Sequence, residues 1–124
     1  MKFVCEKSAL LKVLQNVSRS VSSKSNIPAL EGIHVSVKGS LANFEGFNME
    51  FGIKTSLDVN EAEEGEIVIP AKIFTDIIKK LPDSLIVVYT ENLNVLINCL
   101  DCNFMISGFS ADDFPNLPGV ENES

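Results

Sequence analysis

The residues best suited to chemistry are three lysines on a short amphipathic segment between Pro70 and Pro82. The two prolines suit the two ends of a helix, and apolar residues recur between them with the spacing of one helical face, at Ile73, Phe74, Ile77, Ile78 and Leu81. At about 100° per residue, Lys72 and Lys79 point away from that face and Lys80 lies at its margin. Spaced ammonium groups on a helix suit contact with phosphate groups more than the reading of base edges. The alternative is an ordinary solvated surface helix.

Catalytic and metal chemistry finds little support in the sequence. Cys99 and Cys102 form a lone CxxC pair, and the only histidine, His34, lies far upstream, so the four ligands of a structural zinc site are lacking. Asp112 and Asp113 are adjacent in a segment expected to be extended, where neighbouring side chains point apart. The sequence contains no phosphate-binding loop, dinucleotide loop or nucleophile elbow. We therefore expect a protein that is not an enzyme and that uses no metal or cofactor.

Length and composition indicate one intracellular domain, or two tightly merged halves. The chain has 124 residues, of which 45% are hydrophobic, and a formal net charge of -7. It contains no apolar run of the roughly 20 residues that a membrane span needs, and its start lacks the apolar core of a signal peptide. An odd number of cysteines argues against a secreted disulfide scaffold. We expect a soluble cytoplasmic protein.

Hydrophobic periodicity predicts two helices among short strands. A second helix is expected at residues 8–20, with Leu10, Leu14 and Val17 on its apolar face. An acidic loop is expected at residues 60–65. The expected strands are residues 2–6, 33–38, 41–47, 51–57, 67–69, 85–90, 93–98 and 103–109.

The chain repeats itself when it is shifted by 64 residues, which places Phe3 on Ile67 and Leu10 on Phe74. Each unit reads as strand, helix and three strands, at about residues 1–60 and 66–110. This predicts an α+β fold of two β-α-β-β-β repeats, with two helices packed on antiparallel sheets. Neither repeat can cover its own sheet, so we expect the two to share one core.

Positive charge is concentrated on the two predicted helices and their flanks. Residues 7–24 and 70–81 hold seven of the ten basic residues and one of the 17 acidic ones, so they carry +6 and the remainder carries −13. If the helices lie side by side, their outer faces form a basic ridge that suits a polyanion. The alternative is that Arg19, Lys79 and Lys80 only complement helix dipoles. The candidate residues on this ridge are Lys12, Arg19, Lys24, Lys72, Lys79 and Lys80.

Several motifs spread over the whole chain carry a family resemblance. They are Met1-Lys2-Phe3, Leu10-Leu11-Lys12, Ile27-Pro28-Ala29-Leu30, Gly46-Phe47-Asn48-Met49-Glu50, Ile69-Pro70-Ala71-Lys72-Ile73-Phe74 and Ala111-Asp112-Asp113-Phe114-Pro115-Asn116-Leu117-Pro118. With these motifs the chain resembles the first domain of the bacterial sliding clamp, the beta subunit of DNA polymerase III. It departs from the family pattern at Ala29 and at Phe47-Asn48, away from the basic helices.

The resemblance implies an architecture larger than this chain. A clamp subunit has three similar domains, and two subunits close head to tail into a homodimeric ring around duplex DNA, with helices lining the hole. Residues 1–118 would be the first domain and residues 119–124 the start of an interdomain linker. Such a ring is a processivity factor on the nucleoid, which binds DNA without sequence preference. The polymerase and the clamp loader would bind through domains absent here.

The resemblance also implies roles for individual residues. Lys24 matches a family position that touches DNA, and the other ridge cations would line the hole by their helix positions. The last strand matches the edge that pairs with the second subunit, with Phe104 and Ile106 as apolar anchors. A competing interpretation is a protein-interaction module without direct DNA contact, in which the lysines only improve solubility.

Overall fold

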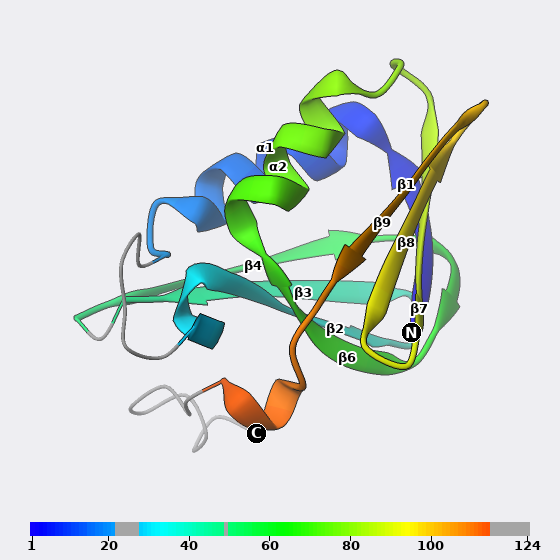
Figure 1. Ribbon diagram of the computed structural model, residues 1–124. Helices are drawn as coiled ribbons and strands as arrows, with labels where there is room; N and C mark the ends of the chain where they lie inside the picture. The colour runs from blue at the N-terminus through cyan, green and yellow to red at the C-terminus, as the bar shows by residue number, and fades with distance from the viewer. Residues whose placement is uncertain (22–27, 49, 115–124) are drawn as a thin grey trace.

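The computed structural model describes residues 1–21, 28–48 and 50–114 (Figure 1). Two antiparallel sheets meet at an angle, and both helices cover their inner side. The elements in chain order are β1 (Lys2–Glu6), α1 (Lys7–Ser18), η1 (Pro28–Glu31), β2 (Gly32–Lys38), β3 (Leu41–Phe47), β4 (Gly52–Asp58), β5 (Asn60–Glu63), β6 (Gly65–Pro70), α2 (Ala71–Lys80), β7 (Leu85–Glu91), β8 (Asn94–Cys99), β9 (Cys102–Ser107) and η2 (Ala111–Asp113).

The two repeats exchange their first strands. The five-stranded sheet has the order β5-β1-β7-β8-β9, and the four-stranded sheet has the order β4-β3-β2-β6. The first strand of the first repeat, β1, therefore pairs with the second repeat, and β6 pairs with the first. This exchange confirms the predicted fold and joins the repeats into one unit, because neither sheet is complete without the other repeat.

One core lies between the sheets and the helices, and the repeat-related positions fill it. Leu10 on α1 and Phe74 on α2 are both fully buried, as are Leu14 and Ile78. The ring of Phe3 on β1 packs edge-on against Phe44 of the other sheet, with ring centroids 5.9 Å apart. Burial of matching apolar faces against both sheets explains why two short helices are stable in this chain.

The acidic segment after β4 corrects the sequence interpretation. Residues 60–65 were expected to form a loop, but β5 pairs antiparallel with β1. Strand pairing uses backbone groups, so the glutamate side chains can stay in solvent while Ala62 packs against the core. The pairing also covers an edge of β1 that would otherwise be open.

The ends of α2 follow from two prolines, as the sequence predicts. Pro70 precedes the first helical residue, and Leu81, which precedes Pro82, is extended with φ −74° and ψ 153°. Ile73, assigned by its spacing to the apolar face, is instead 51% exposed because it lies on the flank of the helix next to Phe74. No helix in the described part of the chain is long and apolar enough to cross a membrane.

The last described segment closes a second, smaller core. Phe114 is buried and packs in a cluster with Leu30, Phe47 and Val68. Asp112 lies in η2, a 3-10 turn, and the side chain of the N-cap residue Ser110 accepts a hydrogen bond from the Asp112 amide, so the expectation of an extended segment here is wrong. Residues 115–118 of the most specific motif and the expected linker at 119–124 fall outside the described residues.

Candidate nucleic-acid interface

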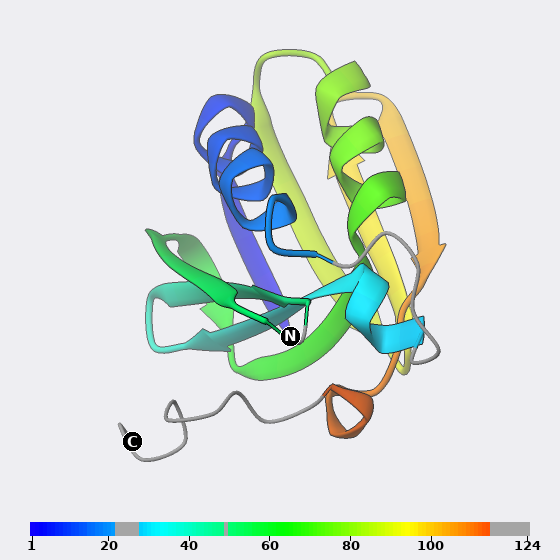
Figure 2. The ribbon, with the colours of Figure 1, turned by 90° about the vertical axis from the view of Figure 1, so that its left-hand side faces the viewer.

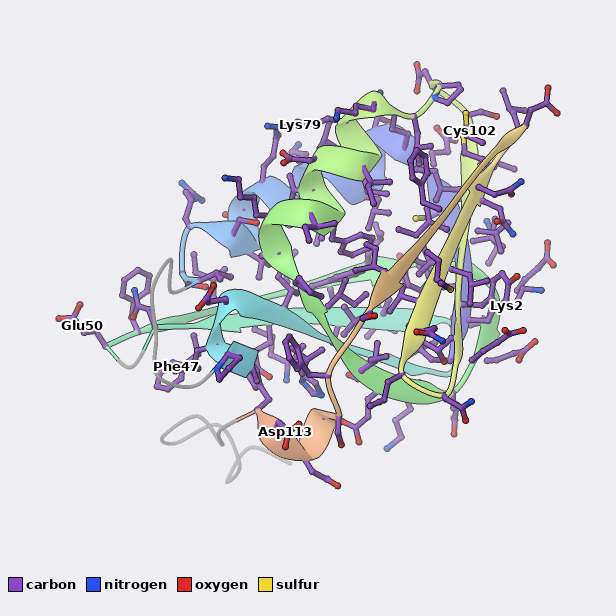
Figure 3. All side chains as sticks on the ribbon, viewed as in Figure 1. Lys2, Phe47, Glu50, Lys79, Cys102 and Asp113 are labelled. Atoms are coloured by element: carbon purple, nitrogen blue, oxygen red, sulfur yellow. The ribbon has the colours of Figure 1, made fainter. Side chains whose placement is uncertain are left out.

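The two helices lie side by side on one side of the molecule, which meets the condition under which their outer faces form one basic ridge (Figure 2). Figure 3 places Lys79 on this side and Asp113 at the opposite end of the chain's fold. Lys24 lies outside the described residues. The predicted cations that the structure describes are all exposed: Lys12, Arg19, Lys72, Lys79 and Lys80.

Lys7 belongs to the same basic segment, but its ammonium group forms hydrogen bonds within the fold. Its Nζ donates to the backbone carbonyl oxygens of Lys79 at 2.9 Å and of Leu81 at 2.6 Å. These carbonyls stand at the C-terminus of α2, where helix carbonyls lack intrahelical partners and the dipole favours a cation. Lys7 thus ties α1 to the end of α2, and its ammonium is not directed to an outside ligand.

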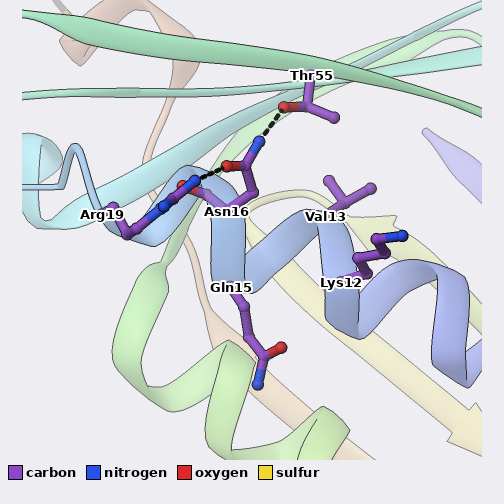
Figure 4. Close-up of a pocket in the computed structure, with 6 residues that line it drawn as sticks. All are labelled: Lys12, Val13, Gln15, Asn16, Arg19 and Thr55. Atoms are coloured by element: carbon purple, nitrogen blue, oxygen red, sulfur yellow. Dashed lines mark hydrogen bonds between the residues drawn. The ribbon is translucent and has the colours of Figure 1, made fainter.

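Arg19 is held in place by a network that reaches a strand (Figure 4). Its Nη2 donates to the Oδ1 of Asn16, and its Nε donates to the Asn16 carbonyl at 3.4 Å. The Nδ2 of Asn16 in turn donates to the Oγ1 of Thr55 on β4 at 3.0 Å. No local pattern indicates this link, because Asn16 and Thr55 are 39 positions apart.

Two of the clefts that border the helices differ in charge. A cleft of about 520 Å³ lies between α1 and β4, and the described residues that line it are Lys12, Arg19, apolar Val13 and uncharged polar side chains, with no carboxylate among them. A cleft of about 430 Å³ between the ends of α1 and α2 brings Lys72 together with Glu31 and Asp76. The first cleft therefore suits an anion better than the second.

The predicted edge strand lies at the edge of its sheet. β9 pairs with β8 on one side, and the sheet order ends there. Phe104 is 38% exposed, whereas Ile106 is 6% exposed and packs in the domain's own core. Met105, which the sequence interpretation did not single out, is 66% exposed. Ile73 is also exposed, on the helix that contacts β9.

A second polar network, on the four-stranded sheet, was missed by the sequence interpretation. His34 Nε2 lies 2.8 Å from a carboxylate oxygen of Glu66, and its Nδ1 lies 3.4 Å from one of Glu45. The ring of Phe114 stacks on the imidazole, with centroids 5.4 Å apart. Burial opposes protonation, but hydrogen bonds and charges from the two glutamates outweigh it and raise the pKa of His34.

The strands expected at residues 93–98 and 103–109 put Cys99 and Cys102 on the turn between them, and the structure agrees. Cys99 ends β8 and Cys102 begins β9, on either side of a tight turn, and both are free. Burial, with a smaller contribution from Glu6, raises the pKa of the Cys5 thiol to about 12, so its reactive thiolate is strongly disfavoured. Within the described residues, no group of three or more His, Cys, Asp or Glu side chains could hold a metal ion.

Comparison with known proteins identifies the family to which this chain belongs. Residues 1–118 match the family described as DNA polymerase III beta subunit, N-terminal domain. The beta sliding clamp of Bacillus subtilis is 30% identical over 130 residues, which cover 98% of this chain and 34% of that protein.

Solved structures agree with this match. A putative DNA polymerase III beta subunit from Eubacterium rectale has a TM-score of 0.91 at 36% identity, over 97% of this chain and 33% of that one. The Helicobacter pylori beta clamp bound to a DNA ligase peptide has a TM-score of 0.91 at 26% identity, over 98% and 34%. The chain thus spans about a third of the length of these relatives. It belongs to the family of DNA polymerase III beta subunits, the bacterial sliding clamps, and corresponds to their N-terminal domain.

Proposed function

We propose that this chain is the first domain of a processivity factor that encircles duplex DNA and tethers the replicative polymerase. The observation that carries the proposal is the gathering of exposed cations on two adjacent helices of an otherwise acidic chain. Lysines and arginines on helix faces suit phosphate contact without base reading. The domain itself is non-catalytic and acts by holding other proteins on DNA.

The ring closes through β9, the edge strand of the five-stranded sheet. An open edge strand presents unpaired backbone groups that a strand of another subunit can pair with. Exposed Phe104 supplies apolar contact area at this edge, and Ile106 supports the strand from the core side. The relatives' greater length leaves room for further domains that bind the polymerase and loader, and one relative is described as bound to a DNA ligase peptide.

A retention assay on the full-length protein tests this function. The protein is loaded on nicked circular DNA, and its dissociation is followed at increasing salt. Charge reversal of Lys12, Lys72 and Lys79 is expected to shorten retention several-fold and to flatten its salt dependence, because fewer counterions are displaced. Lys54→Glu is the matched control, since Lys54 is also exposed but is adjacent to Thr55 on β4 and so faces the other side of the sheet. Equal retention of all variants would contradict direct DNA contact and favour an interaction module.

A further inference from the structure

The cleft between α1 and β4 is arranged to hold one guanidinium group. Asn16 stands between Arg19 and Thr55 and bonds to both (Figure 4). Arginine can only donate hydrogen bonds, so the amide oxygen of Asn16 must face Arg19 and its amide nitrogen must face the Thr55 hydroxyl. The orientation of Asn16 is therefore set from both sides, by the helix and by the strand.

The held guanidinium keeps hydrogen-bond donors for an outside ligand. Arginine has five N–H groups, and the contacts to Asn16 use one on Nε and one on Nη2. Arg19 is exposed, and its other three donors make no hydrogen bond to the part of the chain that the structure describes, so they can form the paired hydrogen bonds that arginine makes with phosphate. Lys12 lines the same cleft two helical turns earlier and adds a second cation.

The position of Arg19 at the end of α1 has a simpler explanation, which is helix capping. Its Nε–H to the Asn16 carbonyl is a contact of that kind. Capping, however, needs neither the Asn16 side chain nor Thr55. The hydrogen bonds that link the Thr55 hydroxyl, the Asn16 amide and the Arg19 guanidinium have a further effect, because they restrict the arginine side chain before any ligand binds. A restricted side chain loses less conformational entropy when it binds.

We propose that Asn16 and Thr55 are positioning residues that hold Arg19 against a backbone phosphate of DNA. This inference rests on the proposed function and adds a site to it. Arg19 and Lys12 supply the charges that touch the phosphates, whereas Asn16 and Thr55 act only through Arg19. The described residues that line this cleft include no carboxylate, which agrees with an anionic ligand.

The test compares Thr55→Val, which removes the hydroxyl at nearly constant volume, with Thr55→Ser, which keeps it. The isotope-labelled chain is titrated at low ionic strength with a short duplex of mixed sequence, and affinity is read from amide shifts. Relaxation of the Arg19 Nε–H resonance reports the order of its side chain without DNA. Arg19→Ala is expected to weaken binding about fivefold, and Thr55→Val about twofold, as for exposed charge contacts.

Four results together support the inference. The Arg19 side chain becomes more mobile in Thr55→Val and is restricted again in Thr55→Ser, and DNA affinity falls and recovers in the same two variants. In the Arg19→Ala background, Thr55→Val has no effect on affinity. The inference would be overturned if Thr55→Val lowered DNA affinity equally with and without Arg19. It would also be overturned if the mobility of the Arg19 side chain were the same with and without the Thr55 hydroxyl. Charge reversal of Lys72 and Lys79 separates the two proposals. If that reversal weakens binding and Arg19→Ala does not, only this inference fails; if neither does, the proposed function fails with it.

Discussion

Two polar networks link neighbouring elements of this chain, and they differ in where their cation points. On the helix side, Asn16 joins Arg19 to Thr55, and the exposed guanidinium keeps donors for an outside anion. On the strand side, His34 is held between two glutamates that engage both of its ring nitrogens. Positive charge alone therefore does not identify a candidate phosphate-binding residue. We expect such residues to be the cations whose hydrogen-bond donors stay unused within the folded chain.

Lys7 resembles the histidine in this respect, although it lies on the basic helix. Its ammonium is engaged by two backbone carbonyls of the neighbouring helix end. A count of basic residues therefore overstates the positive charge that the ridge offers to a ligand, because it includes Lys7, whose ammonium is hydrogen-bonded within the fold. This distinction between outward and internally used cations can be tested residue by residue.

The largest expected effect is on Lys7. Replacement by methionine keeps most of the apolar stem but leaves the carbonyls of Lys79 and Leu81 without their charged donor. We expect the free energy of unfolding in urea to fall by about 1–2 kcal/mol. Lys12→Met is the control on the same helix and is expected to change stability by less than about 0.5 kcal/mol. Equal losses in the two variants would show that Lys7 has no special structural role.

A smaller effect is expected for His34 and depends on pH. The pKa of His34 is raised above its usual 6.5, so the folded state binds its proton more tightly than the unfolded state does. The resulting stabilisation is complete below about pH 6.5 and is lost as the pH rises through the raised pKa. Urea unfolding over this range is expected to show falling stability in the wild type and a flatter profile in His34→Gln. Since the chain has a single histidine, parallel profiles would refute this assignment.

The smallest effect is expected at the ion pair of Lys2 with Glu61. The two charged atoms are 3.8 Å apart, and the Glu61 side chain is 70% exposed. Exposed pairs of this kind contribute little, so Lys2→Met is expected to change stability by less than about 0.5 kcal/mol and to leave DNA binding intact. If Lys2→Met lowered the free energy of unfolding as much as Lys7→Met does, the distinction between exposed cations and cations bonded within the fold would be contradicted.

Local patterns were enough to predict the helices, most strands and the repeat. Leu10 and Phe74 fall on matching positions because one periodicity governs each helix, and periodicity can be read from neighbours in sequence. The strand at residues 60–63 could not be predicted in this way, because its acidic side chains carry no burial pattern. Its pairing is decided by the open edge of β1, which is a tertiary feature.

The candidate site was predicted in part. Hydrophobic periodicity located the two helices and the charge count located their cations, but neither could tell Lys7 from Lys12. That difference depends on carbonyls more than 70 residues away. The role proposed for Asn16 was equally hidden, because an asparagine in a helix has no distinguishing pattern until Thr55 is placed beside it.

The most direct test of the account is which face of the full-length protein meets DNA. A photo-crosslinking residue is placed singly at Lys12 or Lys79 on the helix side, or at Lys54 or Lys38, exposed lysines of the strands. The protein is then loaded on circular duplex DNA and irradiated. We expect covalent DNA adducts from the two helix positions and none above background from the strand positions. Adducts from Lys38 or Lys54 alone would contradict it.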